Sequence, residues 1–395
     1  MAAAQRLSVK LHPVVGHEAA REALARAFGA GVLPSALLIH GPRGVGKQRM
    51  ALWIAQLHVC ERPEPGPCGA CRACRMALSL EHPDVHWYFP LARPKKSGAD
   101  QLADALEEAR QEAIAEIREQ PLRSGALDEV RGLYVGTVRN MRARAHMRPN
   151  MASGPIFVVG EAELLAPQEA SQEAANALLK LLEEPPGDAR VILTSSEPGG
   201  LLPTIRSRTV PLHLGRLTDR EVADFLQREA GVDDRLAEWS ASLAHGSPGR
   251  ALGFLPDGDE PGALEQLRQR ALELISAATS DDASAVHVCA LGFPPAGARK
   301  LLDLFAFVEE WLRDLAAVAV GSDQQILNRD SVEQVRNAVA RGGVTAAGVP
   351  PAFDAVARAR ELARGNVNPQ LVVSCLLREL REALRDGRAV AEIGS

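Results

Sequence analysis

The sequence predicts a parallel α/β domain followed by an all-helical region. Three apolar runs read as buried strands: residues 36–39, 155–160 and 190–194. They alternate with helical patterns, and this alternation is typical of a parallel sheet. The strand pattern ends at about residue 213, and residues 262–386 read as helix throughout. We therefore expect an α/β plus all-α chain.

Length and composition limit the possible classes of protein. A chain of 395 residues is long enough for two or three domains. The hydrophobic content of 46 % with only 4 % aromatic residues favours helical packing. A net charge of −5 argues against a protein that coats DNA through bulk positive charge. The first residues lack the apolar region of a secretion signal, and no run is long enough to span a membrane. We expect a soluble, cytoplasmic protein with no membrane partner.

The first elements place a phosphate-binding loop. Residues 17–30 form an amphipathic helical pattern, and the strand at 36–39 leads into the sequence GPRGVGK. Gly41, Gly44 and Gly46 let backbone N–H groups curl around phosphates, and Lys47 reaches the terminal phosphates. A helix from Gln48 onward completes the strand–loop–helix context that such a loop needs.

The loop departs from its pattern at the last position. A Ser or Thr after the lysine normally holds Mg²⁺ through its hydroxyl. This chain has Gln48 there. The loop keeps the phosphate cradle and lacks one metal ligand. We therefore expect that it can bind ATP or ADP but does not hydrolyse ATP.

Four cysteines within 15 residues predict a metal site: Cys60, Cys68, Cys71 and Cys74. Structural Zn²⁺ takes four thiolates in tetrahedral geometry, and C-x₂-C spacing lets one turn supply two of them. Disulfides are disfavoured in the cytoplasm, so zinc is the better interpretation. Four thiolates leave no open position for catalysis. The remaining cysteines, Cys289 and Cys375, are expected to be small buried apolar residues.

The middle of the chain contains an insertion and a basic stretch. Residues 91–128 read as an inserted, exposed helix flanked by loops that include Lys95–Gly98, and its charges suggest a solvated face. A helical pattern over 128–147 carries the basic streak Arg139–Arg148. That streak could meet a phosphate backbone, although an ordinary exposed helix is the better interpretation.

Further signals mark the later elements. The helix at 173–184 is stopped by two prolines, Pro185 and Pro186. Thr218 and Glu221 have the spacing of a capping box that opens a helix. Residues 246–249, Gly-Ser-Pro-Gly, predict a turn.

Motifs spread over most of residues 10–255 belong together: Val15-Gly16-His17, the loop ending in Lys47, the four-cysteine segment, the helix Ala175–Glu184 with its two prolines, and Thr204–Arg208. Together they resemble the bacterial clamp-loader branch of the AAA+ proteins, and Asn368–Leu371 resembles the helical collar of that family. The resemblance implies an AAA+ domain at 1–213 with a zinc module at 60–76 and the insertion at about 91–128. It also implies a helical lid at 214–260 and an oligomerising collar at 261–390.

The departures from the family pattern favour its non-hydrolysing delta-prime branch over the ATP-hydrolysing gamma or tau motor branch. The acidic pair that organises Mg²⁺ and water matches Gly160 and Glu161, so the aspartate is missing. Ser195 or Ser196 fills the sensor-1 place, and the sensor-2 arginine matches Gly249, one residue before Arg250. Because phosphoryl transfer relies on Mg²⁺, loss of two metal-organising groups predicts very slow hydrolysis.

Arg208 stands where the family places an arginine finger, although Thr209 replaces the cysteine that follows it. Such a finger acts on the γ-phosphate of a neighbouring subunit, so it does not require a working site in its own chain. A purely structural ion pair within the domain is the alternative role for Arg208.

The resemblance implies gamma or tau and delta subunits as partners, with the sliding clamp and primed DNA met through the complex. Two rival functions stay open: a motor subunit that hydrolyses ATP, and a stand-alone zinc-containing DNA-binding protein.

Overall fold

The computed structural model describes residues 11–94, 101–122, 131–165, 172–365 and 367–386. These residues form two compact units, Met1–Leu252 and Gly253–Ser395, and the division falls within one helix, α10. Each unit is described by itself. None of the helices in the described ranges has the length and apolar character needed to cross a membrane. Lys95–Gly98 of the expected insertion lie outside the described residues.

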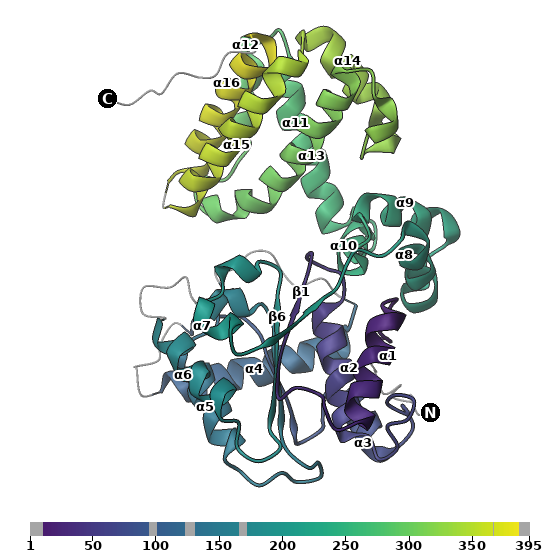
Figure 1. The fold of residues 1–395 in the computed structure, drawn as a ribbon. Coiled ribbons are helices and arrows are strands. Elements are labelled where there is room, and N and C mark those ends of the chain that lie inside the picture. The colour runs from purple at the N-terminus through teal and green to yellow at the C-terminus, as the bar shows by residue number, and fades with distance from the viewer. Residues whose placement is uncertain (1–10, 95–100, 123–130, 166–171, 366, 387–395) are drawn as a thin grey trace, which may run out of the picture. The chain divides into compact units, whose positions relative to one another are not determined.

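The first unit is built on a five-stranded parallel sheet of order β2-β5-β6-β1-β7 (Figure 1). The sheet strands have these bounds: β1 Ala36–His40, β2 Val85–Tyr88, β5 Ile156–Val159, β6 Arg190–Ser195 and β7 Val210–His213. Two short strands, β3 Leu91–Ala92 and β4 Arg131–Gly132, pair antiparallel beside it. The expected parallel sheet is confirmed, and the sequence interpretation missed β2 and β7.

Helices cover both faces of this sheet, because successive side chains of a strand point to opposite faces. One face packs on α1 Glu18–Gly29 and α2 Lys47–Val59. The other packs on α5 Val135–Ala145 and α6 Gln172–Glu183. Strands β5 and β6 lie in the interior of the sheet, and both are buried apart from Arg190, where β6 begins. This burial explains their continuous apolar sequences.

The first unit has further helices: α3 Arg72–Leu78, α4 Leu102–Glu119, α7 Pro203–Arg206, α8 Asp219–Phe225, α9 Asp234–Ala244 and α10 Pro248–Phe254. The capping box at the start of α8 is present, with Thr218 and Glu221 bonded reciprocally. Pro248 and Gly249 begin α10, so the predicted turn at 246–249 is wrong in its second half. The proline is tolerated there because the N–H groups in the first turn of a helix have no acceptor within the helix, so a residue without an N–H loses no hydrogen bond.

Two expectations about the middle of the chain need correction. Helix α4 is only partly exposed, because Leu106 and Arg110 are buried and α4 packs against α5. The helix that carries the basic streak begins at Val135. Within it Arg144 pairs with Glu107 at 2.8 Å, so the streak is not a continuous row of solvated charges.

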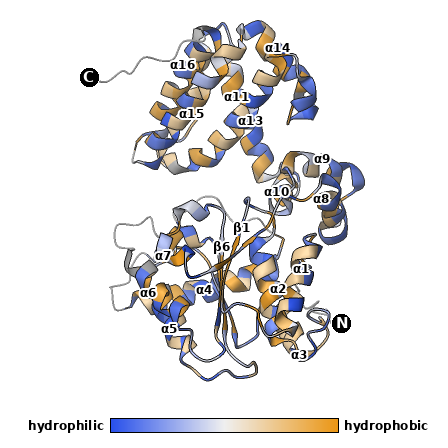
Figure 2. Ribbon diagram, viewed as in Figure 1, coloured by the Kyte–Doolittle hydropathy of each residue, from blue (hydrophilic) through white to orange (hydrophobic). Residues whose placement is uncertain are grey.

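In the described residues of the second unit, helices joined by loops are the regular elements, as the sequence predicts, apart from one isolated bridge between Asp257 and Glu260. Its helices are α11 Ala263–Thr279, α12 Ala283–Leu291, α13 Leu301–Ala319, α14 Val332–Gly342, α15 Val349–Arg364 and α16 Pro369–Asp386. Apolar and polar residues lie side by side along α11, α13, α15 and α16, so each of these helices can bury one face (Figure 2). Cys289 and Cys375 are half-buried and not fully buried as expected.

Candidate functional site

The loop that the sequence predicts to bind phosphate connects β1 to α2 at the carboxyl end of the sheet. Gly41 and Gly44 have φ angles of 146° and 76°, a region that residues with a Cβ rarely adopt. A Cβ on Gly41 would also lie 2.0 Å from the Leu214 carbonyl oxygen. The geometry of the loop therefore requires glycine at both positions.

The lysine of this loop is bound to the loop itself. Lys47 Nζ donates to the carbonyl oxygens of Gly41 at 2.9 Å and Pro42 at 2.6 Å, and the side chain is buried. Burial lowers the pKa of Lys47 to about 8, although the nearby carboxylates of Glu163 and Glu161 partly offset this effect. The donors that would reach terminal phosphates are therefore engaged within the loop.

A side-chain amide lies beside Gly160, the position matched to the missing aspartate. Gly160 follows β5, and a Cβ placed on it would lie 2.7 Å from Nε2 of Gln48. The Oε1 atom of Gln48 accepts a hydrogen bond from Trp87 Nε1 at 3.1 Å. The two positions that depart from the family pattern thus touch each other. Gln48 offers no hydroxyl and Gly160 no carboxylate, which are the oxygen ligands that the family pattern leads us to expect for Mg²⁺ at these positions.

The neighbouring polar residues are organised by β5 and β6. Glu161 has φ 48°, and its N–H donates to Oγ1 of Thr194 at 3.2 Å. Burial raises the pKa of Glu161. Ser195 is fully buried at the end of β6, where its Oγ accepts from the N–H of Glu197, while Ser196 donates its N–H to Glu163. The hydroxyl of Ser195, one of the two candidates for the sensor-1 place, thus serves a local turn.

The start of α10 rests on the loop. The N–H of Gly249 donates to the Gly44 carbonyl at 2.9 Å, and Ser247 Oγ donates to the Arg43 carbonyl at 2.8 Å. A Cβ on Gly249 would come within 3.1 Å of Gly44 Cα. The Nε atom of Arg250 donates to the Leu243 carbonyl. Gly249, the residue matched to the sensor-2 arginine, therefore lies in close backbone contact with Gly44.

The four cysteines come together as predicted. Their sulfur atoms all lie within 4.8 Å of one another, and the Cys68 and Cys74 sulfurs are 3.9 Å apart. Four thiolates around one Zn²⁺ at about 2.3 Å would place their sulfurs about 3.8 Å apart. Cys71 caps the start of α3, and Cys74 lies in its first turn. The cluster can hold a metal ion.

Backbone N–H groups point at these sulfurs. The amides of Cys68, Cys71 and Cys74 each contact a cysteine sulfur at 3.3 to 3.4 Å. Bonds from the N–H groups of Cys71 and Ala70 lower the pKa of Cys68 to about 6. Such donors stabilise thiolates, which are the form that binds metal.

Arg208 follows α7, and its side chain is partly exposed. Its Nε atom lies 2.5 Å from Oε1 of Glu183, the last residue of α6, and its Nη1 donates to the Thr204 carbonyl at 3.1 Å. The ion pair fits a structural role for Arg208. The sequence interpretation did not assign a role to Glu183, although this residue belongs to the helix motif it used.

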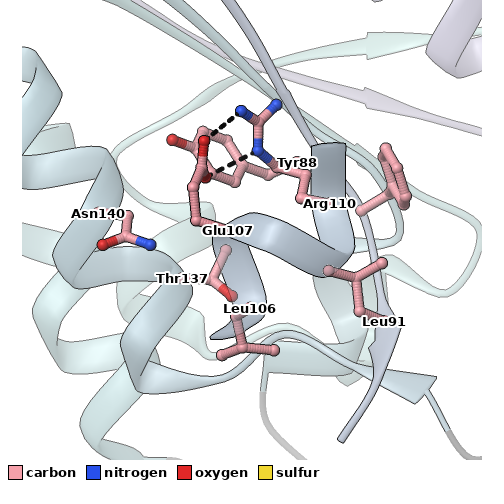
Figure 3. Close-up of a pocket in the computed structure, with 8 residues that line it drawn as sticks. Tyr88, Leu91, Leu106, Glu107, Arg110, Thr137 and Asn140 are labelled. Carbon is pink, nitrogen blue, oxygen red and sulfur yellow. Dashed lines mark hydrogen bonds and ion pairs between the residues drawn. The ribbon is translucent and has the colours of Figure 1, made fainter. Parts of the chain in front are cut away.

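A small recess between α4 and α5 carries no ligand site. Tyr88, Leu106, Thr137 and Asn140 line it together with the Glu107–Arg110 ion pair (Figure 3). The two side chains of the ion pair bond at 2.6 Å, and the Arg110 guanidinium stacks 4.9 Å from the centre of the Tyr88 ring. The recess leaves no room for a water molecule. Its charges support the packing of α4.

Comparison with known proteins identifies the family. A family model described as DNA polymerase III, delta subunit, matches residues 16–218. The delta' subunit of DNA polymerase III from Pseudomonas aeruginosa is 38 % identical over 178 residues, which are 44 % of this chain and 41 % of that protein. The chain thus spans about two fifths of that relative.

Two other relatives extend the match. The delta' subunit from Bacillus subtilis is 24 % identical over 355 residues, 89 % of this chain and 92 % of that protein. The gamma/tau subunit from Mycobacterium tuberculosis is 31 % identical over 248 residues, 61 % of this chain and 36 % of that protein. Residues 16–218, which the family model matches, contain the glycine-rich loop, the four cysteines and Arg208. The chain belongs to the DNA polymerase III delta-subunit family.

Proposed function

We propose that this chain is the delta-prime subunit of a DNA polymerase III clamp loader, works in the cytoplasm, and does not hydrolyse ATP itself. It assembles with gamma or tau and delta subunits and so supports loading of the sliding clamp onto primed DNA. One observation carries the proposal: the Gln48 amide lies over Gly160, where the ligands of Mg²⁺ would otherwise meet. Without that ion, charge on the β- and γ-phosphates is not neutralised.

In this proposal the chain serves a neighbour. Arg208 contributes an arginine finger to an adjacent motor subunit, because its exposed guanidinium does not depend on the loop of its own chain. ATP or ADP binds only when Lys47 leaves the loop carbonyls, so nucleotide occupancy is weak. The four cysteines bind structural Zn²⁺, which is supported by the spacing of their sulfurs.

The test has two parts. The chain is purified alone and then mixed with cognate gamma or tau and delta subunits. We expect co-elution as one complex on size exclusion and negligible ATP turnover by the chain alone. Turnover by the isolated chain at the rate of a motor subunit would show that the motor assignment is the correct one.

The second part replaces Arg208 with alanine in the assembled complex. Removal of an arginine finger costs about 10³- to 10⁵-fold at the affected site in other phosphoryl-transfer systems. Only one motor site would face Arg208, so we expect a partial loss of DNA-stimulated turnover. The control is Arg206→Ala, because Arg206 is also exposed and makes no side-chain bond within the described part of the chain. Equal turnover in both variants would remove the finger role.

A further inference from the structure

Two nitrogen atoms of the Arg208 guanidinium are held by its own domain. Nε contacts Glu183, and Nη1 donates to the Thr204 carbonyl and lies 3.4 Å from Ser207 Oγ. Within the described residues, Nη2 has no bonding partner. The guanidinium is thus held at Nε and Nη1, and the N–H of Nη2 that points away from Glu183 stays available to a group from outside.

The stability of α6 does not explain Glu183. It is the last residue of the helix, and Glu184 separates it from Pro185 and Pro186. A negative charge at a helix C-terminus is unfavourable because the helix dipole is negative there. The carboxylate is better explained by its partner on the adjoining α7 segment, which packs against α6.

We propose that Glu183 is a positioning residue for Arg208, so that Nη2 is presented to the terminal phosphate of a nucleotide held by a neighbouring subunit. This inference rests on the proposed finger role of Arg208. An arginine has many rotamers, and an anchored one loses less freedom when it meets the phosphate. Because Glu183 is itself partly exposed, water screens the pair, and the guanidinium keeps its attraction for a phosphate.

The adjacent residue provides a matched control. Glu184 is exposed like Glu183, and its side chain makes no ion pair or hydrogen bond within the described part of the chain. Glu183→Ala and Glu184→Ala remove the same charge from neighbouring positions. Only the first removes the contact with Arg208.

The experiment measures DNA-stimulated ATP turnover in fully assembled clamp-loader complexes. Size exclusion first shows that each variant assembles. We expect Glu183→Ala to reduce turnover at the affected site by about two- to five-fold, as for loss of one partly exposed ion pair. Glu184→Ala should leave turnover unchanged. In an Arg208→Ala background, Glu183→Ala should have no further effect, because its action passes through Arg208.

The outcomes separate this inference from the proposed function. A loss of turnover with Arg208→Ala but none with Glu183→Ala overturns the positioning role and leaves the finger intact. Equal losses with Glu183→Ala in both backgrounds show that Glu183 acts on structure alone. If Arg208→Ala itself has no effect, both the finger and its positioning residue are ruled out.

Discussion

At the scale of residues, Gln48 and Gly160 form a packed contact at the two positions where the family pattern predicts ligands of Mg²⁺. Neither Gln48 nor Gly160 supplies the ligand atom that the family pattern predicts at its position. In the structure the Gln48 amide packs against Gly160. A larger residue at 160 would collide with the Gln48 amide, which Trp87 holds in place. The two departures therefore depend on each other, and a single reversal should not rebuild the site.

This dependence can be measured with a double-mutant cycle. Gly160→Asp should destabilise the first unit by about 1 to 3 kcal/mol, because the new side chain overpacks against Gln48. Gln48→Thr vacates that space, so the double variant should be less destabilised than the sum of the single variants, by about 0.5 to 3 kcal/mol. Urea denaturation of the unsubstituted protein, the two single variants and the double variant gives the three changes in the free energy of unfolding that the cycle compares.

Gly199 supplies the control for this cycle. A Cβ on Gly199 would meet nothing within 4 Å, so Gly199→Asp should change stability little and show no coupling to Gln48→Thr. Additive effects for the Gly160 pair would contradict the packed contact. ATP turnover should stay negligible in Gln48→Thr, since the carboxylate at 160 is still missing.

The sequence predicted most residues of the candidate site but not their contacts. Glycines, cysteines and Lys47 are recognised by spacing, because each spacing reflects a local geometry. The contact of Gln48 with Trp87 joins residues 39 positions apart. It could not be predicted because β2, which contains Trp87, went unrecognised. The Arg208–Glu183 pair was missed for the same physical reason, since it depends on how two helices pack.

At the scale of elements, burial explains which predictions succeeded. Strand β5 is apolar throughout and β6 contains the apolar run Val191–Leu193, because both sheet faces are covered, and such runs are easy to recognise. Strand β2 has the mixed sequence VHWY and lies at the sheet edge. Strand β7 contains Pro211 and is mostly exposed. An edge strand needs no apolar alternation, so its sequence carries a weak signal.

The zinc module, residues 60–76, is an element whose order should depend on bound Zn²⁺. Among the cysteines, Cys71 and Cys74 are buried against a small cluster that includes Ala73 and Ala77. Few apolar residues support this segment, so we expect metal binding to supply much of its stability. Elemental analysis should find about one Zn²⁺ per chain. Chelation or Cys68→Ser should increase amide exchange over residues 60–80 and leave β5 and β6 protected.

A cysteine outside the module provides the comparison. Cys289→Ser changes a half-buried thiol in the second unit, and it should alter neither zinc content nor exchange at 60–80. Metal-free protein with four reactive thiols and unchanged exchange would contradict the zinc assignment.

At the scale of the whole molecule, the chain consists of two units with separate cores. In the second unit α11, α13, α15 and α16 pack together around Leu304, Phe305, Val308 and Trp311. A buried network also joins its segments, in which Arg268 bonds Glu265, Asn328 and Asp330. These contacts lie within residues 253–395, so this unit has what it needs to fold alone.

The last prediction concerns that unit as the site of assembly. A fragment of residues 253–395 should fold cooperatively, as measured by circular dichroism during urea denaturation. It should also bind cognate gamma or tau and delta subunits without the first unit, because the proposed collar role assigns association to these helices. The comparison fragment is 1–252, which should retain zinc and bind those partners more weakly. A folded 253–395 fragment that fails to associate would contradict the collar role, whereas the zinc and Arg208 proposals would stand, because their residues all lie in the first unit.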